Sequence, residues 1–400
     1  MSVGLLSSAA PPSSINKDSF ATLITRLGPN GSAPLYGLTS LLAPEPAVNV
    51  EHGYFSKTMI FPTLQLDGAI ANGAATAFTV DATGDAVPGD LFLVDTTQEI
   101  VMVDALVSST AITMRRGVGS TAAAAIADNV VLRHICNAFA EASTRPSPVN
   151  IVAQYVSNYT QIFRNSWAVS KTLAAMQQVA GNGHVAESRA DCAMLHAVAI
   201  EKALFFGQKY MGTKDGQPLH TMDGIIARVT AAAPGNITTL GSTTNWTQLE
   251  AALDPMLATV TDPKGGSIRT MFCGGTTMRV LTNIARLNAS YQITKSETAY
   301  GLRIKQFDTP RGTFEAIEHP LFNAYGAAST WARMAVVCDL NAFSVNYLRP
   351  TATENYNESG VQVDNGIDAK GGTLTTELTN TIKNPAAFGL IYNFTAAAAG

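Results

Sequence analysis

Charged side chains are scarce in this sequence. Lys and Arg number 26 and Asp and Glu number 30, so 14% of the 400 residues are charged, against about 25% in a typical soluble protein. The formal net charge is −4, and Arg115 and Arg116 are the only adjacent basic pair, so nothing predicts a general attraction to nucleic acid or to an anionic membrane. Because the cores of protein interfaces are depleted of charge, a surface this poor in Lys and Glu predicts assembly with other subunits.

Cysteines are few, and long apolar runs are missing. The four cysteines are separated by 56, 81 and 65 positions, which excludes a local zinc motif and a dense disulfide framework and predicts free thiols in a reducing compartment. No segment approaches the ~18 consecutive apolar residues needed to span a bilayer. The N-terminal residues carry no positive charge before their short apolar run, so we expect neither a secretory signal nor a membrane partner.

Enzyme signatures are also missing. The sequence contains no Gly-x4-Gly-Lys-Ser/Thr, Gly-x-Gly-x-x-Gly, His-Glu-x-x-His, Cys-x-x-Cys or Gly-x-Ser-x-Gly motif. Its six histidines are dispersed, and none pairs with a second His or a Cys at a metal-ligand spacing on one element. We therefore expect no catalytic residue, no cofactor and no metal site.

Two weaker patterns stay open. Asp81, Asp85 and Asp90 surround glycine-containing turns, where they would suit calcium ligation but fit β-turns equally well. His319 lies close to Glu315 and Glu318 on an expected strand, and such a pair would supply acid/base chemistry in an enzyme. A polar strand face explains the same three residues more simply.

The residue pattern in the first part of the chain changes twice. Residues 1–55 are rich in Ser, Pro, Gly and Asn, which predicts an N-terminal arm that docks on a neighbour through Leu23, Ile24 and Leu27. For the first 15 residues a disordered tail is an equally good explanation. Residues 67–135 alternate in short β segments between turns and predict a small β-barrel or sandwich of about five strands. This insertion interrupts an extended β-loop expected over residues 56–66 and 136–172.

Helices follow the loop, which makes the predicted fold class α+β. Residues 187–210 are the strongest predicted helix, with apolar residues on several faces, inside a unit spanning 173–222. Residues 223–300 mix helices and strands, and 301–400 read as returning strands. On the helix expected over 276–289, two arginines share the face opposite the apolar one, where they meet carboxylates of a neighbouring subunit or face water.

The order of these parts and two short passages resemble a known family. SNYTQIFRNSWAVSKT, from Ser157, resembles a strand-turn-helix passage of phage major head proteins, and MRRGVGSTAAAAIAD, from Met114, is similar to a β-domain passage of many phage virion proteins. The chain thereby resembles the major capsid proteins of tailed double-stranded DNA bacteriophages, which have the Hong Kong 97-like fold. The similarity covers most of residues 50–395 as an order of elements.

The resemblance implies an N-arm, an E-loop, a peripheral domain with a spine helix, and an axial domain. It implies a structural virion protein that self-assembles through hexamers and pentamers into the icosahedral head, with assembly in the host cytoplasm. Implied partners are further copies of the chain, scaffold, portal and decoration proteins, and double-stranded DNA that is enclosed without sequence-specific binding. We expect the subunit interface to contain Leu23, Ile24, Leu27, Tyr155, Tyr159, Phe163, Trp167, Arg279 and Arg286.

Functions from two other classes are alternatives. A surface or tail adhesin would explain the Thr- and Asn-rich β insertion, but it needs an aromatic surface that faces its ligand, and the insertion has only Phe78 and Phe92. An enzyme would have to build a dispersed site around His319. A capsid protein is the favoured hypothesis.

Overall fold

The computed structural model divides into two compact units. It describes residues 33–39, 46–57, 62–84, 86–145, 150–176, 183–257, 268–287, 296–299, 302–309, 311–356 and 368–398. One unit is Phe55–Tyr155, and the other combines Met1–Tyr54 with Val156–Gly400. The insertion therefore begins and ends where β1 (Glu51–Ser56) pairs with β8 (Gln154–Tyr159).

The unit Phe55–Tyr155 contains one six-stranded antiparallel sheet. An isolated bridge between Leu66 and Val80 links the ends of its two edge strands and closes the sheet into a small barrel. Phe78, Phe92 and Leu132 are among the side chains that fill its interior. In the order β2-β7-β4-β5-β6-β3, the strands are β2 (Thr63–Gln65), β7 (Val131–Asn137), β4 (Asp90–Val94), β5 (Ile100–Leu106), β6 (Ala111–Arg115) and β3 (Ala77–Thr79).

The sequence analysis identified five of these six strands. In β4, Phe92 and Val94 are fully buried whereas Leu91 and Leu93 are partly exposed, which is the alternation that the period-2 pattern predicts. The sixth strand, β2, was assigned to the loop segment 56–66. It is only three residues long and buries only Leu64, so it is too short to show a periodic pattern.

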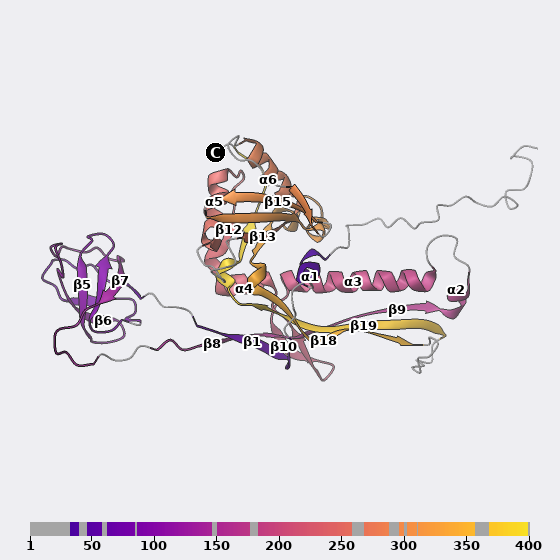
Figure 1. The fold of residues 1–400 in the computed structure, drawn as a ribbon, viewed down its shortest axis with the longest axis horizontal. Helices are drawn as coiled ribbons and strands as arrows, with labels where there is room; N and C mark the ends of the chain where they lie inside the picture. Colours follow the sequence, from indigo (N-terminus) through magenta and orange to yellow (C-terminus); the bar gives the residue numbers. More distant parts are fainter. Residues whose placement is uncertain are drawn as a thin grey trace, which may run out of the picture. The chain divides into compact units, whose positions relative to one another are not determined.

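In the other unit, a long helix lies along a three-stranded sheet (Figure 1). The sheet has β19 (Ala369–Ile382) between β18 (Phe343–Tyr356) and β9 (Gln161–Ser170), all antiparallel. The helix α3 (His184–Phe206) begins after Gly183, whose φ of 101° is readily adopted only by glycine. Buried residues at a spacing of four, Cys192, His196 and Ile200, form the face that α3 turns toward the sheet.

Two expectations for this region differ from the structure. The predicted loop segment 136–172 includes β9, which pairs with β19 over ten residues and is thus part of the sheet of this unit. The predicted helix is contacted from several sides only toward its C-terminal end, where Glu201, Leu204 and Phe205 are buried. Before that end, Met194 and Leu195 are exposed, since none of the described elements covers that side.

A seven-stranded mixed sheet forms the rest of the unit. Its order is β12-β20-β17-β13-β16-β15-β14, with parallel pairs β12/β20 and β13/β16. The strands are β12 (Ile237–Thr239), β13 (Ile268–Cys273), β14 (Ser296–Ala299), β15 (Leu302–Thr309), β16 (Gly312–Glu318), β17 (Ala335–Cys338) and β20 (Gly389–Tyr392), and the helices are α4 (Ile225–Ala232), α5 (Trp246–Leu253) and α6 (Gly275–Leu287). Asn245 caps α5 in a reciprocal capping box with Gln248.

Short elements complete the described fold. A hairpin of β10 (Tyr210–Lys214) and β11 (Gln217–Thr221) turns at Asp215 and Gly216, which both have positive φ as a tight hairpin turn requires. The remaining helical elements are α1 (Pro34–Thr39), α2 (Lys171–Ala175) and the 3-10 turns Pro234–Asn236, Asp254–Leu257, Pro320–Asn323, Trp331–Arg333, Leu340–Ala342 and Pro385–Ala387.

The core of the larger unit has two main parts. One cluster joins α3, the three-stranded sheet and one face of the mixed sheet, with Phe205 packed edge-on against Phe272 at 5.5 Å. The second lies between the mixed sheet and the helices α5 and α6, where Leu249, Met271 and Ile284 meet. Because the first cluster is shared by both sheets, the helix and the two sheets form one body, and the fold class is α+β as predicted.

Candidate assembly surfaces

The predicted interface tyrosines differ in how much surface they offer. Tyr155 is 51% exposed, and its ring lies 5.2 Å from that of Phe55, which is 73% exposed. Tyr159 is partly buried, with the ammonium group of Lys209 4.5 Å from the centre of its ring. Tyr155 therefore keeps apolar surface for a neighbour, whereas much of Tyr159 is already covered within the chain.

Phe163 and Trp167 lie in the interior of their own subunit. They are 7% and 4% exposed, and they point from β9 toward the side of the sheet that α3 covers. The sequence analysis expected them at the subunit interface because a run of aromatic residues does not show which face of a strand is covered. As placed here, their side chains have little surface left for a neighbour.

The opposite face of β9 is the exposed one. Ile162 is 51% exposed, and Arg164 and Ser166 follow it on the same face. Period-2 geometry makes this face the complement of the buried one, so the alternate residues of the strand are the ones available for contact.

Helix α6 carries the predicted arginines on its exposed side. Arg279 and Arg286 are two turns apart and line a groove of about 570 Å³ together with Asn283, Leu287 and the C-terminal residues 395–397. No ion pair joins either arginine to any of the residues that the structure describes. The groove is thus basic and has one apolar wall.

The predicted arm anchors Leu23, Ile24 and Leu27 lie outside the described residues. The first described segment of the arm is α1, in which Leu35 is completely buried against α3 and the sheets. Docking of the arm onto its own subunit is thus visible over residues 33–39.

A polar network holds the start of the β1–β8 pair against the larger unit. The side-chain amide of Asn158 donates to the backbone carbonyl of Asp223 and to both the carbonyl and Oδ1 of Asn380, at 2.8 to 3.2 Å. Its Oδ1 accepts from the backbone N–H of Asp223 at 2.8 Å. Tyr54 adds a hydrogen bond of 2.6 Å to the carbonyl of Ile382. One asparagine thereby connects three segments, which the sequence analysis did not detect.

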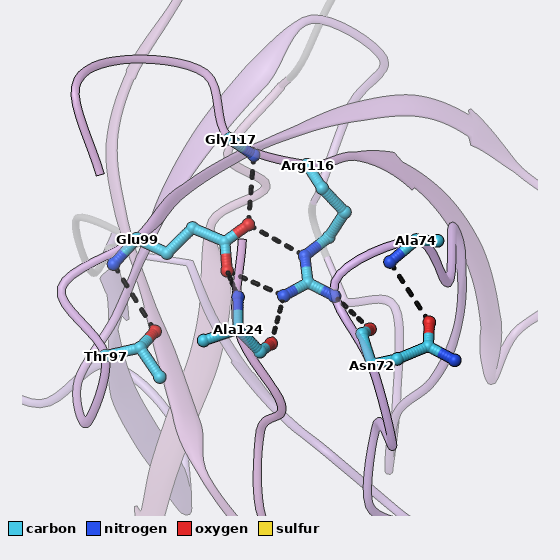
Figure 2. A network of polar contacts seen from close by, with 7 residues as sticks. All are labelled: Asn72, Ala74, Thr97, Glu99, Arg116, Gly117 and Ala124. Carbon is cyan, nitrogen blue, oxygen red and sulfur yellow. Dashed lines mark hydrogen bonds and ion pairs between the residues drawn. The ribbon is translucent and has the colours of Figure 1, made fainter. Parts of the chain in front are cut away.

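The barrel contains a buried ion pair (Figure 2). The carboxylate of Glu99 accepts from Nε and Nη2 of Arg116, both at 2.7 Å, and from the backbone N–H of Gly117 at 2.9 Å. Arg116 also donates to the carbonyls of Asn72 and Ala124. The arginine-glycine passage quoted for the resemblance therefore secures the loop that follows it to the barrel, a role that local sequence patterns do not reveal.

The acid/base alternative does not match the geometry. His319 donates from Nε2 to Glu201 at 2.7 Å, and both side chains are completely buried, so no substrate reaches them. Glu318 instead accepts from the side chain of Asn323. Glu201 was missed as the partner because it is 118 residues away in the sequence.

The calcium alternative has no support in the described residues either. Asp90 accepts from the backbone N–H of Val87 as in a turn and lies 3.6 Å from His134. Asp81 is exposed and Asp85 lies outside the described residues. Over the part of the chain that the structure describes, no three His, Cys, Asp or Glu side chains gather as metal ligands would.

A further exposed apolar surface lies on the β10–β11 hairpin. Tyr210, Met211 and Leu219 are 55%, 62% and 40% exposed. The sequence analysis did not propose these residues for the subunit interface, although apolar residues on both sides of an Asp-Gly turn are a signal for a β-hairpin. An isolated two-stranded hairpin rarely exposes this much apolar surface without a partner.

The chain is similar to known proteins over nearly its whole length. The family model described as SU10 major capsid protein matches residues 11–395. The major capsid protein of Pseudomonas phage PaMx41 is 37% identical over 396 residues, which cover 96% of this chain and 93% of the relative. Among solved structures, Mycobacterium phage Cain matches with 7% identity and a TM-score of 0.49 over 99% of this chain and 100% of that one, and Mycobacterium phage Bobi with 11% identity and 0.46 over 97% of each.

The family match settles which of the hypotheses holds. The order of parts in the described residues, with a long helix against a three-stranded sheet and an α/β unit after it, is that of the Hong Kong 97-like fold. In the described residues no helix is both long and apolar enough to cross a membrane. The match over nearly the whole chain means that the protein belongs to the SU10 major capsid protein family and is a structural protein of the phage virion, whose copies form the icosahedral head.

Proposed function

We propose that copies of this capsid protein associate as hexamers and pentamers through the α6 groove, the exposed face of β9, the β10–β11 hairpin and the N-terminal arm. In this proposal, residues 173–222 form the peripheral domain and residues 223–300 the axial-type domain, and the strands returning from 301–400 belong to both. The unit Phe55–Tyr155 takes the place of an E-loop with a small barrel added to it.

The α6 groove is the observation that carries the proposal. Arg279 and Arg286 are both exposed and lie on one helix face with no ion pair to described residues. The chain as a whole is acidic, so carboxylates of a neighbouring copy are the natural counter-charges. Pairs of this kind add specificity and speed to association more than they add affinity.

The insertion can supply such carboxylates. Residues 55–155 contain nine acidic and five basic side chains, which accounts for the whole net charge of −4 in the chain. Pairing between an acidic insertion and a basic groove on different copies would match opposite charges across an interface. A low charge density also suits a container for double-stranded DNA, because a strongly basic lining would bind the phosphates and hinder packaging.

Further partners follow from the same proposal. A head of this kind encloses double-stranded DNA without sequence-specific contacts. Scaffold, portal and decoration proteins would be its other partners. Membership in a major capsid protein family supports self-assembly of the chain into a shell.

The test reverses the charges of the groove. Arg279→Glu with Arg286→Glu should leave a folded subunit that forms far fewer rings or shells, as seen by negative-stain microscopy and light scattering. The matched control is Arg279→Lys with Arg286→Lys, which keeps both charges. If the charge-reversed chain formed normal shells, the groove would not be part of the subunit interface.

Truncation of residues 1–30 tests the arm in the same assay. A folded subunit that assembles poorly would support an arm role in assembly. Shells formed as readily as by the full chain would contradict that role.

A further inference from the structure

The first described segment of the arm docks on a carboxylate. Glu201 of α3 is completely buried, and its Oε1 and Oε2 accept from the backbone N–H groups of Leu35 and Tyr36 at 2.9 and 2.8 Å. The same carboxylate accepts from Nε2 of His319 at 2.7 Å. Among the described residues, the hydrogen-bond donors to this buried carboxylate are thus two backbone N–H groups of one arm segment and one histidine ring.

The arm segment also has side-chain contacts at this place. The side chain of Leu35 is 0% exposed inside the core cluster that contains Ile200 and Leu204 of α3. The hydroxyl of Tyr36 lies 3.2 Å from that of Tyr347 on β18. Residues 33–39 are thus held by the fully buried Leu35 with Tyr36 and Leu38 packed beside it, by two charge-assisted hydrogen bonds and by one hydroxyl pair.

The rest of the site belongs to elements that do not need the arm for their own pairing. Glu201 projects from the C-terminal part of a 23-residue helix, His319 follows β16 of the mixed sheet, and Tyr347 lies in β18. His319 is itself enclosed by aromatic rings, stacked on Phe322 at 4.4 Å and edge-on to Phe205 at 5.1 Å. These contacts orient the imidazole before any arm segment arrives.

We propose that Glu201, oriented by His319, is the recognition site of a peptide-docking groove, and that its ligand is the segment 33–39 of this chain. A buried carboxylate is costly unless it is hydrogen-bonded, so the site selects a segment that presents two adjacent free backbone N–H groups. Pro34 has no N–H, and its ring fixes the start of the segment that presents the next two. The inference does not depend on the surfaces proposed above for assembly.

The experiment cuts the chain between ligand and site. A protease recognition sequence is inserted between Thr39 and Pro46 of the full-length chain, and the purified subunit is cleaved and passed over a size-exclusion column. The N-terminal fragment should co-elute with the remainder. Release of the fragment directly after the cut in the otherwise unchanged chain would overturn the proposal.

Substitutions identify the group responsible. Glu201→Gln keeps the shape but turns one acceptor oxygen into a donor, so the fragment should dissociate at least about tenfold faster, as loss of a charge-assisted hydrogen bond predicts. His319→Leu should act in the same direction, and His319→Gln, which retains a donor, should restore most of the retention. Asp191→Asn removes an exposed carboxylate from the same helix and should change nothing.

Amide hydrogen exchange on the intact chain covers the case in which a variant fails to fold after cleavage. The amides of Leu35 and Tyr36 should be protected in the unchanged chain and should exchange at least about tenfold faster in Glu201→Gln, while the amides of β19 stay protected. Equal protection of Leu35 and Tyr36 in both chains would contradict the proposed role of Glu201.

Discussion

The guanidinium group of Arg116 and the carboxylate of Glu99 form a bidentate ion pair inside the barrel, with two nitrogen–oxygen distances of 2.7 Å. The side chains are 4% and 0% exposed. The neighbouring Arg115 pairs with Asp104 at 3.2 Å on the surface, where its side chain is 63% exposed. Two adjacent arginines thus occupy opposite environments: Arg115 is the last residue of β6 and faces solvent, whereas Arg116 directly follows the strand and turns inward.

Arg116→Met is expected to destabilise the barrel by about 3–5 kcal/mol, because it leaves the Glu99 carboxylate buried without its counter-charge. Arg115→Met should change the free energy of unfolding by less than about 1 kcal/mol, as is usual for exposed pairs. Urea unfolding of both variants at neutral pH measures the difference. Similar stabilities for the two would mean that the buried pair is not coupled to folding.

Acid should weaken the same pair. Burial alone would raise the pKa of Glu99, but hydrogen bonds from Arg116, Gly117 and Ala124 hold it below the ordinary value of 4.5. A carboxyl group with a lowered folded pKa stabilises the fold above its unfolded pKa, and this contribution is lost as the pH falls through the folded value. Barrel stability should therefore fall below about pH 4.5, and Glu99→Gln should flatten that part of the stability profile.

Trp167→Ala should act on folding. The indole is 4% exposed between β9 and α3, and removal of a buried aromatic side chain costs about 3–5 kcal/mol. Ile162→Ala, on the exposed face of the same strand, should leave the thermal midpoint nearly unchanged and reduce the yield of shells. Calorimetry and light scattering on both variants separate the two effects. A Trp167→Ala chain of normal stability that does not assemble would return this residue to the interface.

His196 predicts a second pH dependence, at higher pH. Burial lowers its pKa from the ordinary 6.5, and its two ring nitrogens lie 2.8 Å from Asn165 Oδ1 and Thr376 Oγ1. Between the folded pKa and about 6.5, the unfolded chain binds a proton on His196 and the folded chain does not. The free energy of unfolding should therefore fall as the pH drops below about 6.5 and level off below the folded pKa. A depression of one pKa unit corresponds to about 1.4 kcal/mol. Unfolding midpoints between pH 5 and 8 should show this slope in the unchanged chain and not in His196→Gln.

The cysteines should differ sharply in reactivity. Cys136 is exposed on β7, whereas burial raises the pKa of the Cys192, Cys273 and Cys338 thiols and keeps them protonated. Brief alkylation of the folded subunit, followed by mass spectrometry, should label Cys136 and leave the other three until the chain is unfolded. Early labelling of Cys273 or Cys338 would indicate that the mixed sheet opens locally.

The sequence by itself determined the elements whose signals are local. Alternating burial along β4 to β6 and the long uninterrupted helix α3 can both be read from neighbouring residues, because strand and helix periods are properties of the backbone. The order of those elements, with the passages around Ser157 and Met114, was enough to identify the capsid family. The sequence did not predict β2, because three residues are too few to show a periodic pattern.

Only the tertiary structure decided which residues form the candidate sites. It placed Phe163 and Trp167 inside the subunit and Ile162 outside, since a strand's alternation shows that two faces exist but not which of them a helix covers. It also joined His319 to Glu201 and Glu99 to Arg116, and it put Asn158 between Asp223 and Asn380. These partners are 17 to 222 residues apart, and at such separations contact depends on how the whole chain packs rather than on any local pattern.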